Sequence, residues 1–285
     1  MIFSVFGNLS NEKSLDIAKK IIPILAINSN KIYFSNKYKC SFDFNGCCFA
    51  DEDEMYRICD IAVAIGGDGT TMKVAKNAAV NGKSALGING GRLGFLSAVE
   101  KNELSMLNAV LNGDYTVDER IMLQADIIKD GEILKSFHCL NDAVFSRGDF
   151  ARLIDINIRS NGREILKVRA DGVIISTPTG STAYSLAAGG PVLSPDLNCF
   201  VITSICPHSL MDRSIVLNST FVLDVALTSD VSNNAILTCD GEKPFEIDSE
   251  SYVSVSISPY KARLIKIKPD NFYEIVKKKI IERGE

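Results

Sequence analysis

The hydrophobic pattern of the chain changes its period near residue 117. Before this point, short apolar runs alternate with stretches of helical periodicity. This pattern predicts strands at 2–6, 31–34, 61–65 and 85–89, and helices at 10–27, 71–79 and 103–112. Pro23 is expected to kink or shorten the first helix. Strands that alternate with helices favour an open parallel sheet, which binds ligands at the carboxyl ends of its strands.

After residue 117 the apolar positions recur with a period of two. Strands are predicted at 122–129, 133–138, 153–159, 164–169, 173–175, 200–205, 215–216, 221–227, 235–239, 252–256 and 264–267. Asp130-Gly131 and Asn161-Gly162 predict two hairpin turns. The pattern predicts an α/β domain at 1–116 and an all-β, sandwich-like layered domain at 117–269. A last amphipathic helix at 271–283, within 270–285, is expected to pack back on the first domain.

Composition and charge narrow the function classes. The chain has 285 residues, of which 46% are hydrophobic and 23% charged, as expected of a globular protein. The net charge of −4, without a long basic run apart from 277–279, argues against a nucleic-acid partner. Eight scattered cysteines without a Cys-x-x-Cys pair, and two histidines, argue against zinc and favour a reducing cytoplasm. No signal-peptide pattern and no apolar run of about 20 residues is present, so no membrane association is expected.

Gly66 to Thr70 combine a phosphate cradle with a carboxylate. The apolar run 61–65 ends in three glycines around Asp68, and a helical pattern follows at once. In such a loop, backbone N–H groups approach a phosphate closely, and a carboxylate can take a proton from a hydroxyl. The residues therefore indicate phosphoryl transfer to an alcohol. The alternative is a tight turn in which Asp68 bonds its own backbone.

The segment 169–192 is rich in hydroxyl groups. Five of them lie within seven residues, at Ser176, Thr177, Thr179, Ser181 and Thr182. They precede a helical stretch at 183–188, and hydroxyls and free amides at a helix start favour binding of anions and sugar hydroxyls. Tyr184, in the first turn, is placed to stack on a base. A helix cap without a ligand is the alternative, but one cap needs fewer polar groups.

These stretches resemble the blocks of the NAD kinase family. The family's blocks match Gly66–Thr70, Asn89–Leu96, Asn141–Asp142 and Ala170–Pro191, in the family's order and across residues 60–245. The resemblance implies transfer of the γ-phosphate of ATP to the 2′-hydroxyl of the adenosine ribose of NAD, with Asp68 as general base. It also implies Mg²⁺ on the donor's phosphates, for which the sequence shows no dedicated carboxylate cage. NAD and ATP are the implied small-molecule partners, and a homodimer or homotetramer the implied assembly.

The resemblance and the residue chemistry together give a predicted set of site residues. The predicted phosphate loop comprises Gly66, Gly67, Gly69, Thr70 and Lys73. The predicted NAD site comprises Asp68, Gly69, Phe95, Asn141, Asp142, Arg152, Arg169, Asp171, Thr179, Thr182, Ala183, Tyr184, Ser185, Leu186, Ala187, Cys206 and Glu242.

Individual roles within this set follow from side-chain chemistry. Asn141-Asp142 is expected to end a strand, where Asn141 can read an adenine edge and Asp142 can accept from two ribose hydroxyls. Arg169 can pair with a phosphate or with Asp171. Ala187 stands where the family often has Ser, and Glu242 where it has an amide.

Two other functions remain open from the sequence. The first is a kinase with a similar Gly-Gly-Asp-Gly loop that acts on a lipid alcohol or a sugar phosphate. The second is a non-catalytic dinucleotide sensor, which would bind NADP without turnover and would not need Asp68.

Overall fold

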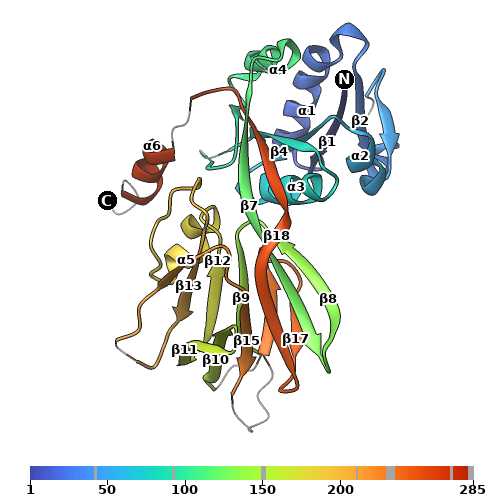
Figure 1. Ribbon diagram of the computed structural model, residues 1–285. Coiled ribbons are helices and arrows are strands. Elements are labelled where there is room, and N and C mark those ends of the chain that lie inside the picture. The colour runs from blue at the N-terminus through green and yellow to red at the C-terminus, as the bar shows by residue number, and fades with distance from the viewer. Residues whose placement is uncertain are drawn as a thin grey trace. The chain divides into compact units, whose positions relative to one another are not determined.

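The computed structural model describes residues 1–41, 44–91, 94–148, 152–209, 211–228, 235–269 and 272–281 (Figure 1). The chain divides into two compact units, Met1–Glu119 with Ala262–Glu285, and Arg120–Lys261. The expected boundaries were 116/117 and 269/270. The second boundary lies earlier because strand β18 (Ser251–Lys266) runs from the second unit into the first. Each unit is described separately below.

The first unit is built on a parallel sheet. Its strands are β1 (Ile2–Gly7), β2 (Lys31–Ser35), β3 (Cys48–Ala50), β4 (Ile61–Gly66) and β5 (Ser84–Asn89), in the order β5-β4-β1-β2-β3. Neighbouring strands in this order pair in parallel, which confirms the predicted open parallel sheet. The short β6 (Val99–Glu100) and the end of β18 also pair in parallel with β5.

The first unit also contains five helices among its described residues. They are α1 (Glu12–Leu25), α2 (Glu52–Ile58), α3 (Asp68–Val80), α4 (Leu107–Asn112) and α6 (Phe272–Val276). Shorter turns are η1 (Ile27–Ser29), η2 (Asn36–Tyr38), η3 (Leu104–Met106) and the π-helical turn η5 (Lys277–Ile281). The helix predicted at 103–112 is thus divided into η3 and α4, and α2 and β3 were not predicted. Of the predicted last helix, 270–271 and 282–285 lie outside the described residues.

The core of this unit explains why α1 forms. The Asn11 side chain accepts the N–H groups of Lys13 and Ser14, which caps the helix. Ile17, Ala18 and Ile21 recur at helical spacing and are buried. They belong to one core cluster with alternate residues of β1, β4 and β5. The helix includes Pro23 and ends two residues later, at Leu25.

The strand order reverses beside β1. β1 pairs with β2 on one side and with β4 on the other, so successive connections leave β1 in opposite directions. Such a topological switch point leaves a crevice at the carboxyl ends of the strands. β1 ends at Gly7 and β4 at Gly66, so Asn8 and Asp68 follow neighbouring strand ends. Gly66 is opposite Asn89 in the register of β4 and β5, which confirms that the Asp68 loop and Asn89 share one edge.

The second unit consists of antiparallel strands in two layers. One layer contains β7 (Thr116–Lys129), β8 (Glu132–Cys139), β10 (Ile154–Ser160), β11 (Arg163–Ala170), β15 (Leu223–Leu227) and β18. The other contains β9 (Asp142–Arg147), β12 (Gly172–Ser176), β13 (Cys199–Ile205), β14 (Ile215–Asn218), β16 (Ala235–Cys239) and β17 (Phe245–Ile247). Residues of both layers, among them Ile156 and Phe200, form one core cluster. The predicted sandwich-like domain is confirmed.

Both predicted hairpin turns are present. Asp130 and Gly131 have φ of 53° and 78°, and Asn161 and Gly162 have φ of 50° and 74°. Positive φ at both central residues is the requirement of the type I′ turn, which Asp-Gly and Asn-Gly meet at low cost.

Two strand predictions are wrong. The strands expected at 252–256 and 264–267 are one continuous strand, β18. Asn141-Asp142 was expected to end a strand, but β8 ends at Cys139 and Asp142 begins β9. Within the part of the chain that is described, no helix is long and apolar enough to cross a membrane.

Candidate functional site

The loop after β4 presents its backbone to open space. Helix α3 begins at Asp68 with Gly67 as N-cap, so the first N–H groups of a 13-residue helix point out of this loop. A Cβ at Gly66 would lie 2.5 Å from the Thr70 hydroxyl, so Thr70 can pack there only because residue 66 is a glycine. A Cβ at Gly67 or Gly69 would have no atom within 4 Å. A ligand can therefore reach the backbone there.

The Asp68 carboxylate is held by three donors. The N–H of Phe95 donates to Oδ2 at 3.0 Å, and the N–H of Leu96 donates to Oδ1 at 3.1 Å. Lys279 Nζ lies 2.8 Å from Oδ2. A carboxylate oxygen accepts up to two hydrogen bonds. With one of these donors on Oδ1, this oxygen can still accept a substrate hydroxyl.

Gly94 makes this arrangement possible. A Cβ at this position would lie 2.4 Å from Asp68 Oδ1 and 3.0 Å from the Ser97 hydroxyl. Only a residue without a side chain lets the 94–96 backbone approach the carboxylate so closely. Two residues of the same sequence block, Arg92 and Leu93, lie outside the described residues.

Asp68 lies in a cavity of about 540 Å³, here called the loop cavity. Backbone and glycine positions line much of it, including Gly66, Gly67, Gly90 and Gly91. Two cations, Lys13 and Lys279, also line it, and Lys279 Nζ lies 4.3 Å from the centroid of the Phe95 ring. A cavity with oriented amides, two ammonium groups and one fixed carboxylate suits phosphate groups beside a reacting hydroxyl. Neither lysine was predicted, because no spacing relates 13 or 279 to the loop.

The second unit has a pocket of about 360 Å³, here called the Asp142 pocket. It brings together four predicted residues, Asn141, Asp142, Ala183 and Tyr184. The side chain of Tyr184 is available to a ligand because the residue is 47% exposed. The pocket is also lined by Val144, Ser146, Thr238, Asp240 and Gly241, which were not predicted.

Asp240 organises this pocket. Its Oδ2 accepts the N–H of Leu140 at 2.9 Å, and its Oδ1 accepts the N–H of Asn141 at 2.7 Å. The turn before β9 is thereby fixed. Burial, with the neighbouring Asp240 charge as a second cause, raises the pKa of Asp142 to about 7. Asp142 therefore changes its charge near neutral pH. Glu242, a predicted site residue two positions after Asp240, is exposed.

Most hydroxyls of the 176–182 segment serve the fold. Thr177 donates to the Leu140 carbonyl at 2.6 Å, and Ser181 donates to the Pro178 carbonyl at 2.7 Å. Both side chains are fully buried. A Cβ at Gly180 would lie 2.2 Å from the Asn141 carbonyl oxygen. The segment is thus held tightly against residues 140–141, and its hydroxyl density reflects this packing.

Ser185 and Asp171 also have partners inside the protein. The Ser185 hydroxyl is fully buried and lies 3.1 Å from the Thr203 hydroxyl. Asp171 pairs with Arg147, whose Nε lies 3.2 Å from Oδ1. Arg169, the partner considered for Asp171, is exposed and accepts the His208 N–H with its carbonyl.

The other predicted residues lie outside the lining of the Asp142 pocket. Arg152, Ala187 and Cys206 are exposed, and Thr182 and Leu186 are partly exposed. Thr179 accepts a hydrogen bond from Arg120 Nη1 at 3.3 Å. Among the described residues, no group of three or more His, Cys, Asp or Glu side chains is placed to hold a metal ion.

Family models match most of the chain. The model of the ATP-NAD kinase N-terminal domain matches residues 50–115, and the model of the ATP-NAD kinase C-terminal domain matches residues 140–267. The NAD kinase of Thermoanaerobacter pseudethanolicus is 35% identical over 98% of both chains. The NAD kinase of Acetivibrio thermocellus is 38% identical over 82% of both chains.

Two solved structures share the fold. Yeast NADH kinase complexed with NADH has a TM-score of 0.88 at 23% identity, covering 99% of this chain and 87% of its own. The NAD kinase from Archaeoglobus fulgidus in complex with ATP has a TM-score of 0.74 at 22% identity, covering 99% of both chains.

Proposed function

Because the chain belongs to the NAD kinase family, we propose that it transfers the γ-phosphate of ATP to the 2′-hydroxyl of the adenosine ribose of NAD. The observation that carries this proposal is the Asp68 carboxylate. It is oriented by two backbone N–H groups inside a cavity suited to phosphates, at the carboxyl ends of parallel strands.

Asp68 acts as the general base. A ribose hydroxyl is a poor nucleophile, and a carboxylate within hydrogen-bond reach accepts its proton as attack proceeds. The 2′-oxygen bonds to the γ-phosphorus, the bond from that phosphorus to the bridging oxygen breaks, and ADP leaves with the electron pair. The proton passes to Asp68. The N–H groups of Phe95 and Leu96 hold the carboxylate in place for this step.

The loop cavity supplies the remaining stabilisation. Its lysines, Lys13 and Lys279, and the N-terminal amides of α3 are placed to bind anionic oxygens. A divalent ion such as Mg²⁺ would arrive on the donor's phosphates, where it neutralises charge.

The Asp142 pocket binds the acceptor in this proposal. Tyr184 stacks on a base, Asn141 reads an adenine edge, and Asp142 accepts from ribose hydroxyls. Ser185 is left out of the binding set because its hydroxyl is buried against Thr203. Ligand contacts from the rest of the predicted set stay predictions.

The proposal also includes the oligomeric state and the cellular compartment of the protein. We expect a homodimer or homotetramer, and light scattering that finds an active monomer would contradict this. None of the eight cysteines, all of which lie in the described part of the chain, is in a disulfide, which supports a reducing compartment such as the cytoplasm.

The test is NADP formation from NAD, ATP and Mg²⁺, read with a coupled NADP-specific dehydrogenase. Diacylglycerol and a sugar phosphate serve as competing acceptors. Turnover with NAD as acceptor, and with neither of the competing acceptors, supports the proposal. Turnover with another alcohol but not with NAD would indicate the other kinase class, and NADP binding without turnover would indicate a sensor.

A further inference from the structure

The segment that holds Asp68 in place leaves the sheet after β5 and returns to it as β6. It begins after Asn89, the last residue of β5, and ends before Val99, the first residue of β6. We call it the β5–β6 loop. It carries Phe95 and Leu96, whose N–H groups donate to the Asp68 carboxylate. The position of the carboxylate therefore depends on the contacts that fix this loop.

Backbone hydrogen bonds join the two ends of the β5–β6 loop. β5 and β6 pair in parallel, with Asn89 opposite Glu100. The Ala98 N–H donates to the Gly87 carbonyl at 2.9 Å. The Lys101 N–H donates to the Asn89 carbonyl at 3.0 Å. Asn89 and Glu100 thus form the residue pair that closes the base of the loop.

The side chains of this pair also bond to each other and to the loop. Asn89 Nδ2 donates to both carboxylate oxygens of Glu100, at 3.2 Å to Oε1 and 3.0 Å to Oε2. Asn89 Oδ1 accepts the N–H of Gly91 at 2.9 Å. The Asn89 side chain is fully buried, whereas Glu100 is partly exposed. A chain of hydrogen bonds therefore runs from Glu100 through Asn89 to the start of the loop.

Glu100 decides which way the Asn89 amide faces. A carboxylate only accepts hydrogen bonds, so it suits the NH₂ group of Asn89 and not its oxygen. A half-turn of the amide would place Oδ1 against the carboxylate and Nδ2 against the Gly91 N–H. Acceptor would then face acceptor, and donor would face donor. Of the two orientations, only the observed one satisfies both contacts.

The carboxylate of Glu100 stands on a backbone that is itself held. The Glu100 N–H donates to Glu103 Oε2 at 3.3 Å, and Glu103 forms an ion pair with Lys268. Glu100 lies outside the described lining of the loop cavity. It can therefore influence Asp68 only through other residues.

We propose that Glu100 is a positioning residue for the general base. It orients Asn89, Asn89 fixes the start of the β5–β6 loop, and the loop presents the two N–H groups that align Asp68. This inference rests on the proposed function, because it takes Asp68 as the base. It goes beyond that function by assigning a role to a side chain that contacts neither the base nor a substrate.

The test is Glu100→Ala in the coupled assay for NADP formation. Without the carboxylate the Asn89 amide can turn, and the base is aligned less well. We expect kcat to fall about tenfold, which is less than for a direct displacement of about 1 Å, and the KM for NAD to stay within about twofold. Glu100→Gln keeps an acceptor oxygen for Nδ2 and should retain kcat within about threefold. The control Glu54→Ala removes the same side chain from an exposed position on α2 and should change neither value.

A double-mutant cycle shows whether Glu100 acts through the base. In the Asp68→Asn background, Glu100→Ala should lower the residual kcat by less than twofold, because no base remains to be misaligned. A tenfold fall in both backgrounds would mean that the two residues act independently and would overturn the inference. A folded Glu100→Ala variant with wild-type kcat would also overturn it, as would an equal loss of kcat in Glu100→Gln and Glu100→Ala.

Amide hydrogen exchange at Phe95 and Leu96 reads the position of the loop without turnover. Glu100→Ala should speed exchange at both amides about tenfold, because their bonds to Asp68 open more often, and Glu54→Ala should not. Unchanged exchange in Glu100→Ala would overturn the inference. Absence of NADP formation by the wild type would instead overturn the proposed function, with exchange still deciding whether Glu100 fixes the loop.

Discussion

Gly94→Ala should slow the enzyme strongly without removing any functional group. The new Cβ would lie 2.4 Å from Asp68 Oδ1, whereas ordinary contact begins at 3.4 Å, so the carboxylate must move by about 1 Å. This movement breaks the alignment with the N–H groups of Phe95 and Leu96. A misplacement of about 1 Å at a reacting group costs about a hundredfold in rate. We therefore expect kcat for NADP formation to fall about a hundredfold.

The control for this experiment is Gly91→Ala. Gly91 lines the same cavity, but a Cβ there would have no atom within 4 Å. Its kcat should stay within about threefold of the wild type, since nothing displaces the base. Circular dichroism and thermal unfolding check that both variants fold. A folded Gly94→Ala variant with wild-type kcat would refute the argument that the position of Asp68 matters.

The remaining predictions concern charge. The pKa of Asp142 is about 7 because the side chain is buried and the charged Asp240 lies beside it. The ionised form of Asp142, which is needed to accept ribose hydroxyls, is therefore lost as the pH falls below 7. The KM for NAD should be about tenfold higher at pH 6 than at pH 8, and Asp142→Asn should abolish this dependence, whereas a flat profile in the wild type would contradict the assignment. Lys279→Met removes the ammonium that pairs with Asp68 and should lower kcat/KM for ATP about tenfold; a faster enzyme would mean that Lys279 blocks the site.

Local sequence signals predicted much of the fold. The Asp130-Gly131 and Asn161-Gly162 turns were found because positive φ at two successive residues restricts the residue types so strongly. Two strands, at 252–256 and 264–267, were predicted where β18 is continuous, and Pro259, which cannot donate to a ladder, lies between them. In the structure, Pro259 lies between the residues paired with β15 and those paired with β5.

Contacts between distant segments could not be predicted in the same way. Asp68 was found because its neighbours in sequence are also its neighbours in space. Lys279 meets Asp68 across 211 positions, and Asp240 caps the turn at Asn141 across 99. No local pattern reports such pairs.

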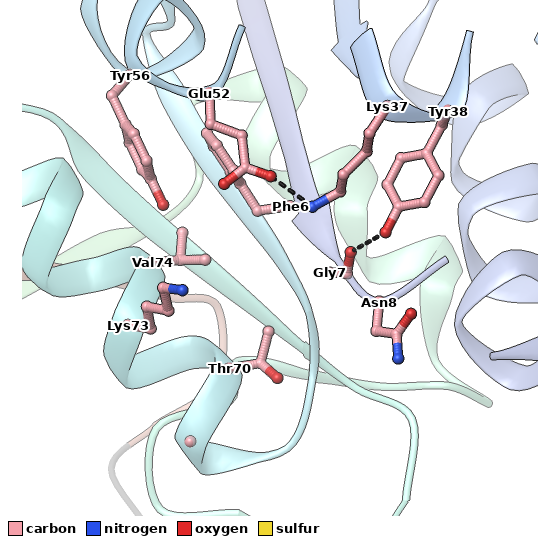
Figure 2. A pocket seen from close by; sticks show the side chains of 11 residues that line it. Phe6, Gly7, Asn8, Lys37, Tyr38, Glu52, Tyr56, Thr70, Lys73 and Val74 are labelled. Carbon is pink, nitrogen blue, oxygen red and sulfur yellow. Dashed lines mark hydrogen bonds and ion pairs between the residues drawn. The ribbon is translucent and has the colours of Figure 1, made fainter. Parts of the chain in front are cut away.

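The cavity of the first unit that Lys37 and Glu52 line (Figure 2) was missed for a related reason. Its residues Lys37 and Glu52 come from η2 and α2, short elements in a part of the chain where the hydrophobic pattern predicts neither. The hydroxyl-rich segment shows the opposite error, because Thr177 and Ser181 bond inside the protein although their residue types suggested a ligand. Residue type alone does not distinguish a polar group that binds a ligand from one that satisfies the backbone.

The most direct test of the central claim is Asp68→Asn in the coupled assay for NADP formation, with NAD affinity measured by calorimetry. Asn has nearly the same shape but cannot accept the proton of the 2′-hydroxyl. The account predicts that NAD affinity is retained within about threefold while kcat falls by about two to four orders of magnitude. A variant that binds NAD and forms NADP at nearly the wild-type rate would contradict the assignment of Asp68 as the base.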